Sequence, residues 1–260
     1  MFFLESAPTP LDLRFRLFGF PVRVTPWFWV VMGLLGSSTL NDPDLGALAI
    51  VIWVACAFVS ILVHELGHSI SARWFRCPSQ IVLIAFGGYA EYYHGAPPSG
   101  WRRLTVCLAG PIAGFLLLGF VYISDQSLHW ADNHPVLMRV YLFLIIQTLF
   151  WNLFNLLPIF PMDGGQALQQ ILYICSVRRP DPPTYTVSVI VAGVLVVAGL
   201  MKLLRQDLGL LGWLPFVPGP FMLVMFGMMA VQNYQLLQQS KQFKSWDEPD
   251  DDAQPWARRR

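Results

Sequence analysis

Charge is scarce in this sequence. Only 13% of the 260 residues are charged, against about 25% in an average soluble domain. The net charge is +1, and there is neither a basic stripe nor the interleaved aromatic pattern that favours nucleic-acid binding, so nucleic acid is not an expected partner. Residues 1–16 lack a basic start followed by an apolar core, so we do not expect a cleavable signal peptide. The four cysteines have no CxxC spacing and indicate little about the redox compartment.

Hydrophobic residues, in contrast, make up 55% of the chain and are collected into long uncharged runs. Residues 104–123 and 140–159 are two such runs of 20 residues each. About 20 apolar residues suffice for a helix to cross the hydrocarbon core of a bilayer. A soluble protein would have to bury several of these runs in one small core. The sequence therefore predicts an integral, multi-pass membrane protein with the lipid bilayer as a partner.

The pattern along the chain predicts an all-α polytopic fold with about six transmembrane helices. The expected spans are 26–36, which is short for a span, 47–74, 104–123, 140–159, 184–201 and 220–237. Residues 13–25 and 81–93 are rich in β-forming residues around a glycine break and predict small β-hairpins, one at the N-terminus and one after the second helix. Residues 1–240 are expected to form one membrane-embedded domain, and the polar residues 241–260 a disordered tail.

Arginine and lysine are unevenly distributed between the loops of this arrangement. With both termini inside, 14 of the 17 basic residues fall on the cytoplasmic side. The positive-inside rule therefore predicts that both termini are cytoplasmic. It also predicts that the loop 37–46 and the turn 205–207 lie opposite the loop that contains Arg178 and Arg179. The expected host is a bacterial inner membrane.

A motif typical of metal chemistry lies in the second expected span. His64, Glu65 and His68 form an HExxH sequence. Positions i and i+4 lie on one face of a helix, so both imidazoles can bind one Zn²⁺ while Glu65 accepts a proton from a water on the metal. Ionisable groups within an apolar span are costly and usually functional. The alternative is a pair of core histidines, with Glu65 bonded to one of them.

A catalytic zinc site has three protein ligands and leaves the fourth position to water. Carboxylates near membrane depth are few, and Asp163 is the best candidate for the third ligand. Two prolines end the fourth span just before it, and two glycines after it let the backbone approach closely. The expected ends of the second and fourth spans lie on the same membrane face, so Asp163 can reach the histidines. The alternative is that Asp163 caps a helix that starts at Gln166.

These motifs together resemble the site-2 protease family of intramembrane zinc metalloproteases. The resemblance rests on HELGH at 64–68 and on NLLPIFPMDGG at 155–165. Weaker similarities are the opening FGFPVRVTPW at 18–27, the glycine-containing hairpin around 86–88, and Ala-Gly-Pro at 109–111. Family members often carry an asparagine just after the last of these, where this chain lacks one. The loops leave no room for a PDZ domain or a CBS pair, so the resemblance is to a minimal core.

The resemblance implies a zinc site and a set of catalytic groups. It assigns His64, His68 and Asp163 as zinc ligands, Glu65 as general base, and Asn155 as a polar group near the scissile carbonyl. Asn155 could stabilise the developing oxyanion, or it could form an interhelical hydrogen bond in the bundle. Asn152 is expected to serve packing, and His94 to be a solvated loop residue.

The expected function is zinc-dependent hydrolysis of peptide bonds in transmembrane protein substrates, within or near the membrane. The hairpin at 81–93 is expected to offer an edge strand to the unwound substrate, the alternative being a hairpin that only anchors its aromatic residues at the membrane surface. Two other functions are considered: a non-catalytic relative that binds membrane proteins as a chaperone, and a metal transporter. The intact Glu65 argues against the first, and the lack of further ligands in the third, fifth and sixth spans argues against the second. A homo-oligomer is left open.

Overall fold

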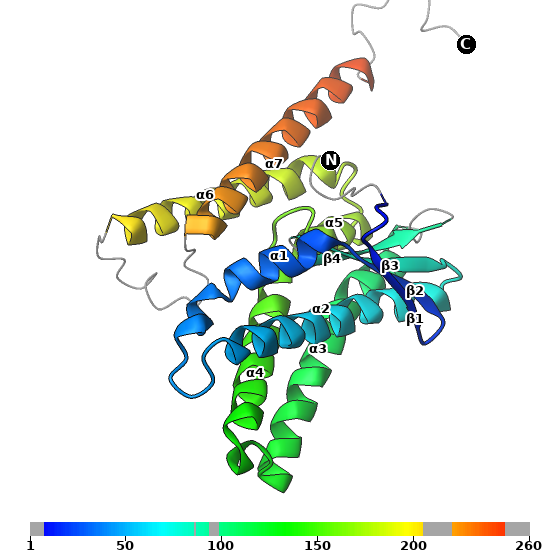
Figure 1. Cartoon of the computed structure of the whole chain (residues 1–260). Coiled ribbons are helices and arrows are strands. Elements are labelled where there is room, and N and C mark those ends of the chain that lie inside the picture. Colours follow the sequence, from blue (N-terminus) through cyan, green and yellow to red (C-terminus); the bar gives the residue numbers. More distant parts are fainter. Residues whose placement is uncertain (1–7, 86, 94–98, 205–219, 248–260) are drawn as a thin grey trace, which may run out of the picture. The chain divides into compact units, whose positions relative to one another are not determined.

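The computed structural model describes residues 8–85, 87–93, 99–204 and 220–247 of the chain. The chain forms two compact units, residues 1–157 and 158–260. The first unit holds a small β-sheet and the helices α1 to α4, and the second holds α5 to α7 (Figure 1). His94 and the turn 205–207 lie outside the described residues.

The sheet of the first unit has four strands. They are β1 (Leu13–Leu17), β2 (Phe20–Val24), β3 (Ser79–Ile84) and β4 (Gly87–Tyr92), in the order β1-β2-β3-β4. The pairs β1/β2 and β3/β4 are antiparallel, one in each segment that the sequence marks as β-forming. The sequence did not predict that β2 and β3 pair in parallel and join the two pairs into one sheet. β4 is therefore one of the two edge strands.

One face of this sheet is apolar because strand side chains alternate between faces. Val22, Val24, Ile81 and Leu83 all lie on this face and are buried. They pack in one core with Ile61, Leu62 and Leu66 of the helix that follows α1. The sheet is thereby fixed against the same stretch of helix that carries HExxH.

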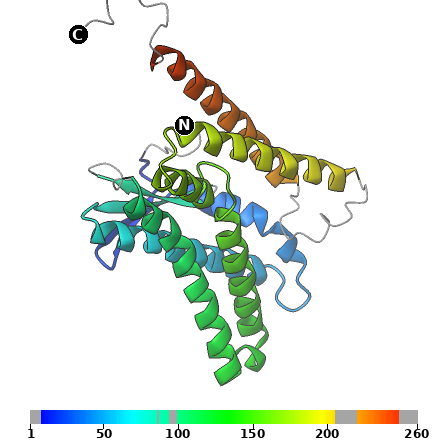
Figure 2. The same cartoon turned by 180° about the vertical axis from the view of Figure 1, so that it is seen from behind.

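The helices of this unit are long and apolar. α1 (Pro26–Leu35) and the short 3₁₀ turn Ser37–Asn41 lead to α2 (Leu48–Trp74), which packs against α3 (Trp101–Leu128) and α4 (Pro135–Asn155). α3 and α4 form an antiparallel hairpin, seen clearly from behind in Figure 2. Pro26 and Pro135 each stand at the start of a helix, where the missing N–H is not needed.

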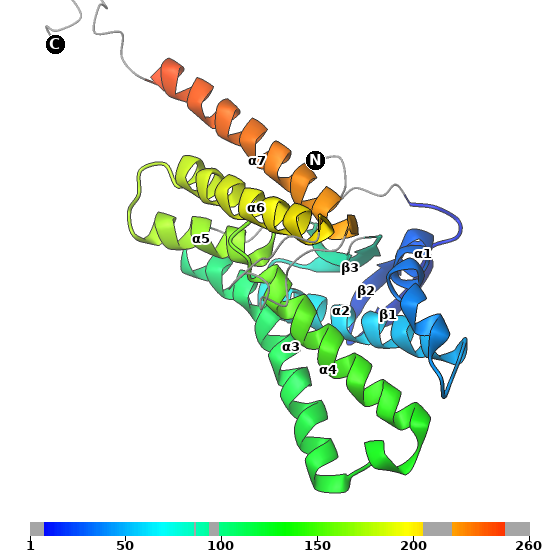
Figure 3. The same ribbon diagram turned by 90° about the vertical axis from the view of Figure 1, so that its left-hand side faces the viewer.

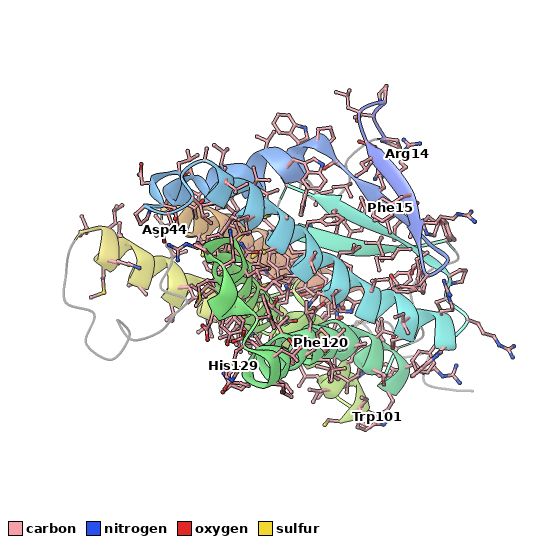
Figure 4. All side chains as sticks on the ribbon, turned by 60° about the horizontal axis from the view of Figure 1, so that its bottom comes forward. Arg14, Phe15, Asp44, Trp101, Phe120 and His129 are labelled. Carbon is pink, nitrogen blue, oxygen red and sulfur yellow. The ribbon has the colours of Figure 1, made fainter. Side chains whose placement is uncertain are left out.

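Charged residues from other segments lie near the start of α2. Beside its start, Arg139 of α4 donates to Asp42 at 2.5 Å and to Asp44 at 3.1 Å. The hydrogen bond from Arg139 holds the pKa of the Asp42 carboxyl below its ordinary value. Arg14 on β1 lies at the far end of the unit from Asp44 (Figure 4).

In the second unit, α5 (Asp163–Ile174) is followed by α6 (Asp181–Leu203) and α7 (Pro220–Asp247). α6 and α7 lie side by side (Figure 3). They hold the segment 158–162 in place, because Phe160 donates its N–H to Ser188 of α6 and accepts a hydrogen bond from the Asn233 amide of α7. Helix α7 continues through Asp247, into the part of the chain expected to be a disordered tail.

Within the described residues, four helices, α2, α3, α4 and α6, are long and apolar enough to cross a membrane. α1 begins where the first span was expected but has only ten residues. At 1.5 Å per residue it is about 15 Å long, half the thickness of a hydrocarbon core. α7 has 28 residues but, over the residues described, is not apolar enough to be counted as a membrane span. The structure therefore supports four spans and does not confirm six.

Candidate metal and catalytic site

The HExxH residues lie in the second half of α2, as predicted. His64, Glu65 and His68 are all buried, with 1%, 4% and 7% of their surfaces exposed. One helical turn separates the two histidines, and their rings meet edge to face with 4.9 Å between centroids. The two Nε2 atoms are 3.2 Å apart. The spacing in the sequence thus brings two ring nitrogens to one point.

The opposite nitrogen of His64 is bonded to α4. Its Nδ1 lies 2.9 Å from Oδ1 of Asn152, while Nδ2 of Asn152 donates to the carbonyl of Thr148 at 2.5 Å. Since Oδ1 can only accept, the bonding pattern assigns the proton of His64 to Nδ1. The expectation that Asn152 serves only packing was therefore wrong. Sequence reasoning missed it because nothing in the pattern shows which face of α4 meets His64.

His68 has the same arrangement with a different partner. Its Nδ1 lies 2.7 Å from the carbonyl oxygen of Val106 on α3. A carbonyl accepts, so His68 also carries its proton on Nδ1. Both Nε2 atoms therefore turn lone pairs toward each other across 3.2 Å, an arrangement that a bound metal ion would stabilise.

The nitrogen pair has the geometry of a tetrahedral metal site. Two nitrogens bound to Zn²⁺ at 2.0–2.1 Å with a tetrahedral angle are about 3.3 Å apart. The observed 3.2 Å fits this value. The hydrogen bond from each Nδ1 to an acceptor is also typical of metal-bound histidines, whose second nitrogen is held by a carbonyl or carboxylate. The imidazole pair therefore fits a zinc ion on both counts.

Glycines let α3 approach the two histidines. A Cβ at Gly110 would overlap the His68 ring, and a Cβ at Gly67 would overlap the backbone of Ala109. The Ala-Gly-Pro motif at 109–111 thus has a steric role, since only a residue without a side chain brings α3 this close. Close approach is also what brings the Val106 carbonyl within hydrogen-bond distance of His68.

Glu65 faces the sheet. A Cβ at Gly88 would lie 2.6 Å from Cγ and 2.9 Å from Cδ of Glu65. Gly88 belongs to β4, whose far side is an edge of the sheet. The carboxyl-bearing side chain next to the histidines is therefore in contact with the edge strand.

Asp163 lies in the second unit, where it is buried as the first residue of α5. The alternative expectation, a cap for a helix starting at Gln166, was wrong in its boundary, because α5 begins at Asp163 itself. Gln166 instead donates its side-chain amide to the carbonyl of Pro161. A Cβ at Gly165 would overlap the backbone of Ile159 and Phe160, so this glycine permits the tight packing before the carboxylate. The N-terminal position favours an ionised carboxylate.

Comparisons with known proteins agree with this arrangement. Residues 52–129, which include HExxH and all of α3, match the model of peptidase family M50. The chain is 31% identical to a zinc metalloprotease of Methanocaldococcus jannaschii over 161 residues, 61% of this chain and 44% of that protein. It is 29% identical to stage IV sporulation protein FB of Bacillus subtilis over 149 residues, 56% of this chain and 46% of that protein.

A solved structure, the site-2 protease from Methanocaldococcus jannaschii, has the same fold. It matches with a TM-score of 0.54 over 87% of this chain and 95% of that one, at 21% identity. The chain is therefore similar to peptidase family M50 over residues 52–129 and to a site-2 protease in its fold. It spans about half the length of the curated relatives it matches. Four membrane-length helices among the described residues, together with the similarity to membrane proteases, support an integral membrane protein.

Asn155, the further residue implied by the family pattern, is the last residue of α4. Its Nδ2 donates to the carbonyl of Trp151 at 2.9 Å, within the same helix. This bond is neither a contact to a substrate oxyanion nor an interhelical hydrogen bond, the two alternatives considered for Asn155, since it stays within α4. The role of Asn155 beside a scissile carbonyl stays a prediction.

Proposed function

We propose that the protein is a zinc-dependent intramembrane endopeptidase that hydrolyses peptide bonds of transmembrane protein substrates within or near the membrane. The observation that carries this proposal is the pair of buried Nε2 atoms, 3.2 Å apart, beside a buried glutamate in a membrane-length helix. A metal ion beside the two Nε2 atoms would bind both lone pairs, and a binding protein or scaffold would not need the adjacent Glu65.

His64 and His68 would hold the metal through Nε2, and we propose Asp163 as the third protein ligand. Three ligands leave one position open, as in catalytic zinc sites. Zinc, when bound, supplies Lewis acidity that lowers the pKa of a coordinated water far below that of bulk water, to about 7, and polarises a carbonyl. The relatives named as zinc metalloproteases support the choice of metal.

Glu65 would act as general base. Its carboxylate accepts the proton of the attacking water and delivers it to the nitrogen of the leaving amine. Burial at 4% exposure keeps bulk water from competing for this proton. Asn155 would hydrogen-bond the oxygen of the scissile carbonyl, a contribution of about 3 kcal/mol if it is well aimed. For this its Nδ2 must exchange the Trp151 carbonyl for the substrate oxygen.

The edge of β4 offers a binding site for the substrate backbone. A transmembrane helix must unwind before its peptide bonds can be cleaved, and the freed N–H and C=O groups then need partners. Tyr93 donates its N–H to Pro78, and antiparallel pairing alternates, so the N–H groups of Gly88 and Ala90 point away from β3. A substrate strand added at this edge would lie beside Glu65, which Gly88 contacts.

The distribution of charge in the first unit supports a cytoplasmic N-terminus and a cytoplasmic catalytic site. Seven of its eight basic residues lie on the sheet, at the end of α2 or at the start of α3: Arg14, Arg16, Arg23, Arg73, Arg76, Arg102 and Arg103. The eighth, Arg139, pairs with Asp42 and Asp44 beside the start of α2. The positive-inside rule then directs the sheet to the cytoplasm. We propose a bacterial inner membrane as the host.

The deciding experiment uses the full chain, purified in detergent and reconstituted with a model transmembrane substrate. Glu65→Gln should retain zinc and lose cleavage, because the base is removed and the ligands stay. Glu91→Gln is the matched control: it removes the same charge from the exposed side of β4, where Glu91 bonds Gln80, and should cleave normally. Cleavage by Glu65→Gln would refute the role of the base. Zinc binding by the wild type with no cleavage of any membrane substrate would favour the non-catalytic binder.

A further inference from the structure

Asn152 is a candidate for more than a structural role. Its side chain is completely buried, with no exposed surface. From α4 it packs tightly against α3, because a Cβ at Gly114 of α3 would overlap the Asn152 amide. It also bonds His64 of α2. Burying an amide requires that both its donor and its acceptor be satisfied. The Asn152 amide has both: it donates to the carbonyl of Thr148 and accepts from His64, and each of these partners matters for the metal site.

The carbonyl of Thr148 fixes which way the amide points. Nδ2 of Asn152 donates to that oxygen at 2.5 Å. The flipped amide would turn Oδ1 toward the same carbonyl, oxygen against oxygen. Only the observed orientation therefore satisfies the amide, and it presents Oδ1 to His64.

The orientation of the amide in turn fixes the tautomer of His64. An acceptor 2.9 Å from Nδ1 keeps the proton there and leaves the Nε2 lone pair for a cation. An apolar side chain in this place would allow the other tautomer, with a proton on Nε2 and no lone pair to bind with. One turn before His64, the hydroxyls of Ser60 and Thr148 are 2.8 Å apart, which holds α2 and α4 in this register.

We propose that Asn152 is a positioning residue, which orients His64 and holds it in the tautomer that binds the metal through Nε2. This inference rests on the proposed metal site. Outer hydrogen-bond partners of metal-bound histidines typically contribute about 10–100-fold to metal affinity or activity. The same range is the effect expected here.

The test is zinc affinity of the purified full chain, measured by competition with a chelator. Asn152→Leu keeps the branched shape and the number of side-chain heavy atoms but removes the acceptor, and it should weaken zinc binding about 10–100-fold. Asn152→Asp keeps an oxygen for His64 but loses the donor to Thr148, so it should bind zinc more tightly than Asn152→Leu. Gln147→Leu is the matched control, since Gln147 is also a buried amide of α4 but bonds the Trp53 carbonyl and not a histidine.

A second readout separates positioning from general destabilisation. In Co²⁺-loaded protein, Asn152→Leu should shift the visible absorption bands of the metal, while Gln147→Leu should leave them in place. If Asn152→Leu does not fold, Asn152→Ser, too short to reach His64, takes its place. Equal affinities and spectra in all variants would overturn the inference and leave the proposed protease intact. No zinc binding by the wild type would instead refute the metal site itself.

Discussion

Gly110→Ala tests how closely α3 must approach the metal site. A Cβ at this position would lie 2.5 Å from Cε1 and 2.7 Å from Cδ2 of His68. Carbon atoms are in favourable contact at about 3.5–4.0 Å, so either the ring or α3 must move by about 1 Å. The ring cannot move without lengthening its 2.7 Å bond to Val106. A methyl group forced into packed surroundings destabilises a protein by about 1–3 kcal/mol.

The expected effect on activity is larger than the effect on stability. A displacement of about 1 Å in a catalytic group can lower the rate about 10²-fold. Gly119→Ala is the matched control on the same helix, since a Cβ at Gly119 meets nothing within 4 Å. It should be neutral or stabilising by up to about 1 kcal/mol, because alanine favours a helix over glycine.

The assay compares zinc content, melting temperature and cleavage rate of the two purified variants. Gly110→Ala should lose zinc or most of its activity, and Gly119→Ala should keep both. If Gly110→Ala retains wild-type zinc content and cleavage, the contact between α3 and His68 does not determine the site, and the reasoning from glycine packing fails.

Three further outcomes are expected. Asp163→Ala should lower both zinc content and cleavage; full zinc content in that variant would remove Asp163 from the ligand set. Ala90→Pro should reduce cleavage but leave zinc content and folding intact, because it deletes a backbone N–H donor on the outer side of the edge strand. Ala90→Ser keeps this donor and should cleave at the wild-type rate. Equal cleavage rates of the two variants would leave β4 with an anchoring role. In a cysteine-free background, cysteines at 42 and 178 should react with an impermeant reagent from opposite sides of the membrane, and labelling from one side would contradict the proposed topology.

The sequence by itself determined that the chain has membrane-length helices and an HExxH motif on one of them. Helical spacing alone puts His64 and His68 on one face, and the structure confirms it. Long uncharged runs identified α2, α3, α4 and α6 because hydrophobic length is a local property. The start of α1 at Pro26 was also readable, since proline favours the first turn of a helix. Local rules sufficed in each of these cases.

Tertiary structure alone decided how the site is held. β2 and β3 are separated by two helices, and no local pattern states that they pair. The facing positions of α2, α3 and α4 depend on how helix surfaces interlock, so the bonds from His64 to Asn152 and from His68 to Val106 were not predictable. For the same reason Asn152 looked like a packing residue and Gly110 like part of a weak motif. A helix sequence states which residues share a face, but only packing determines what that face meets.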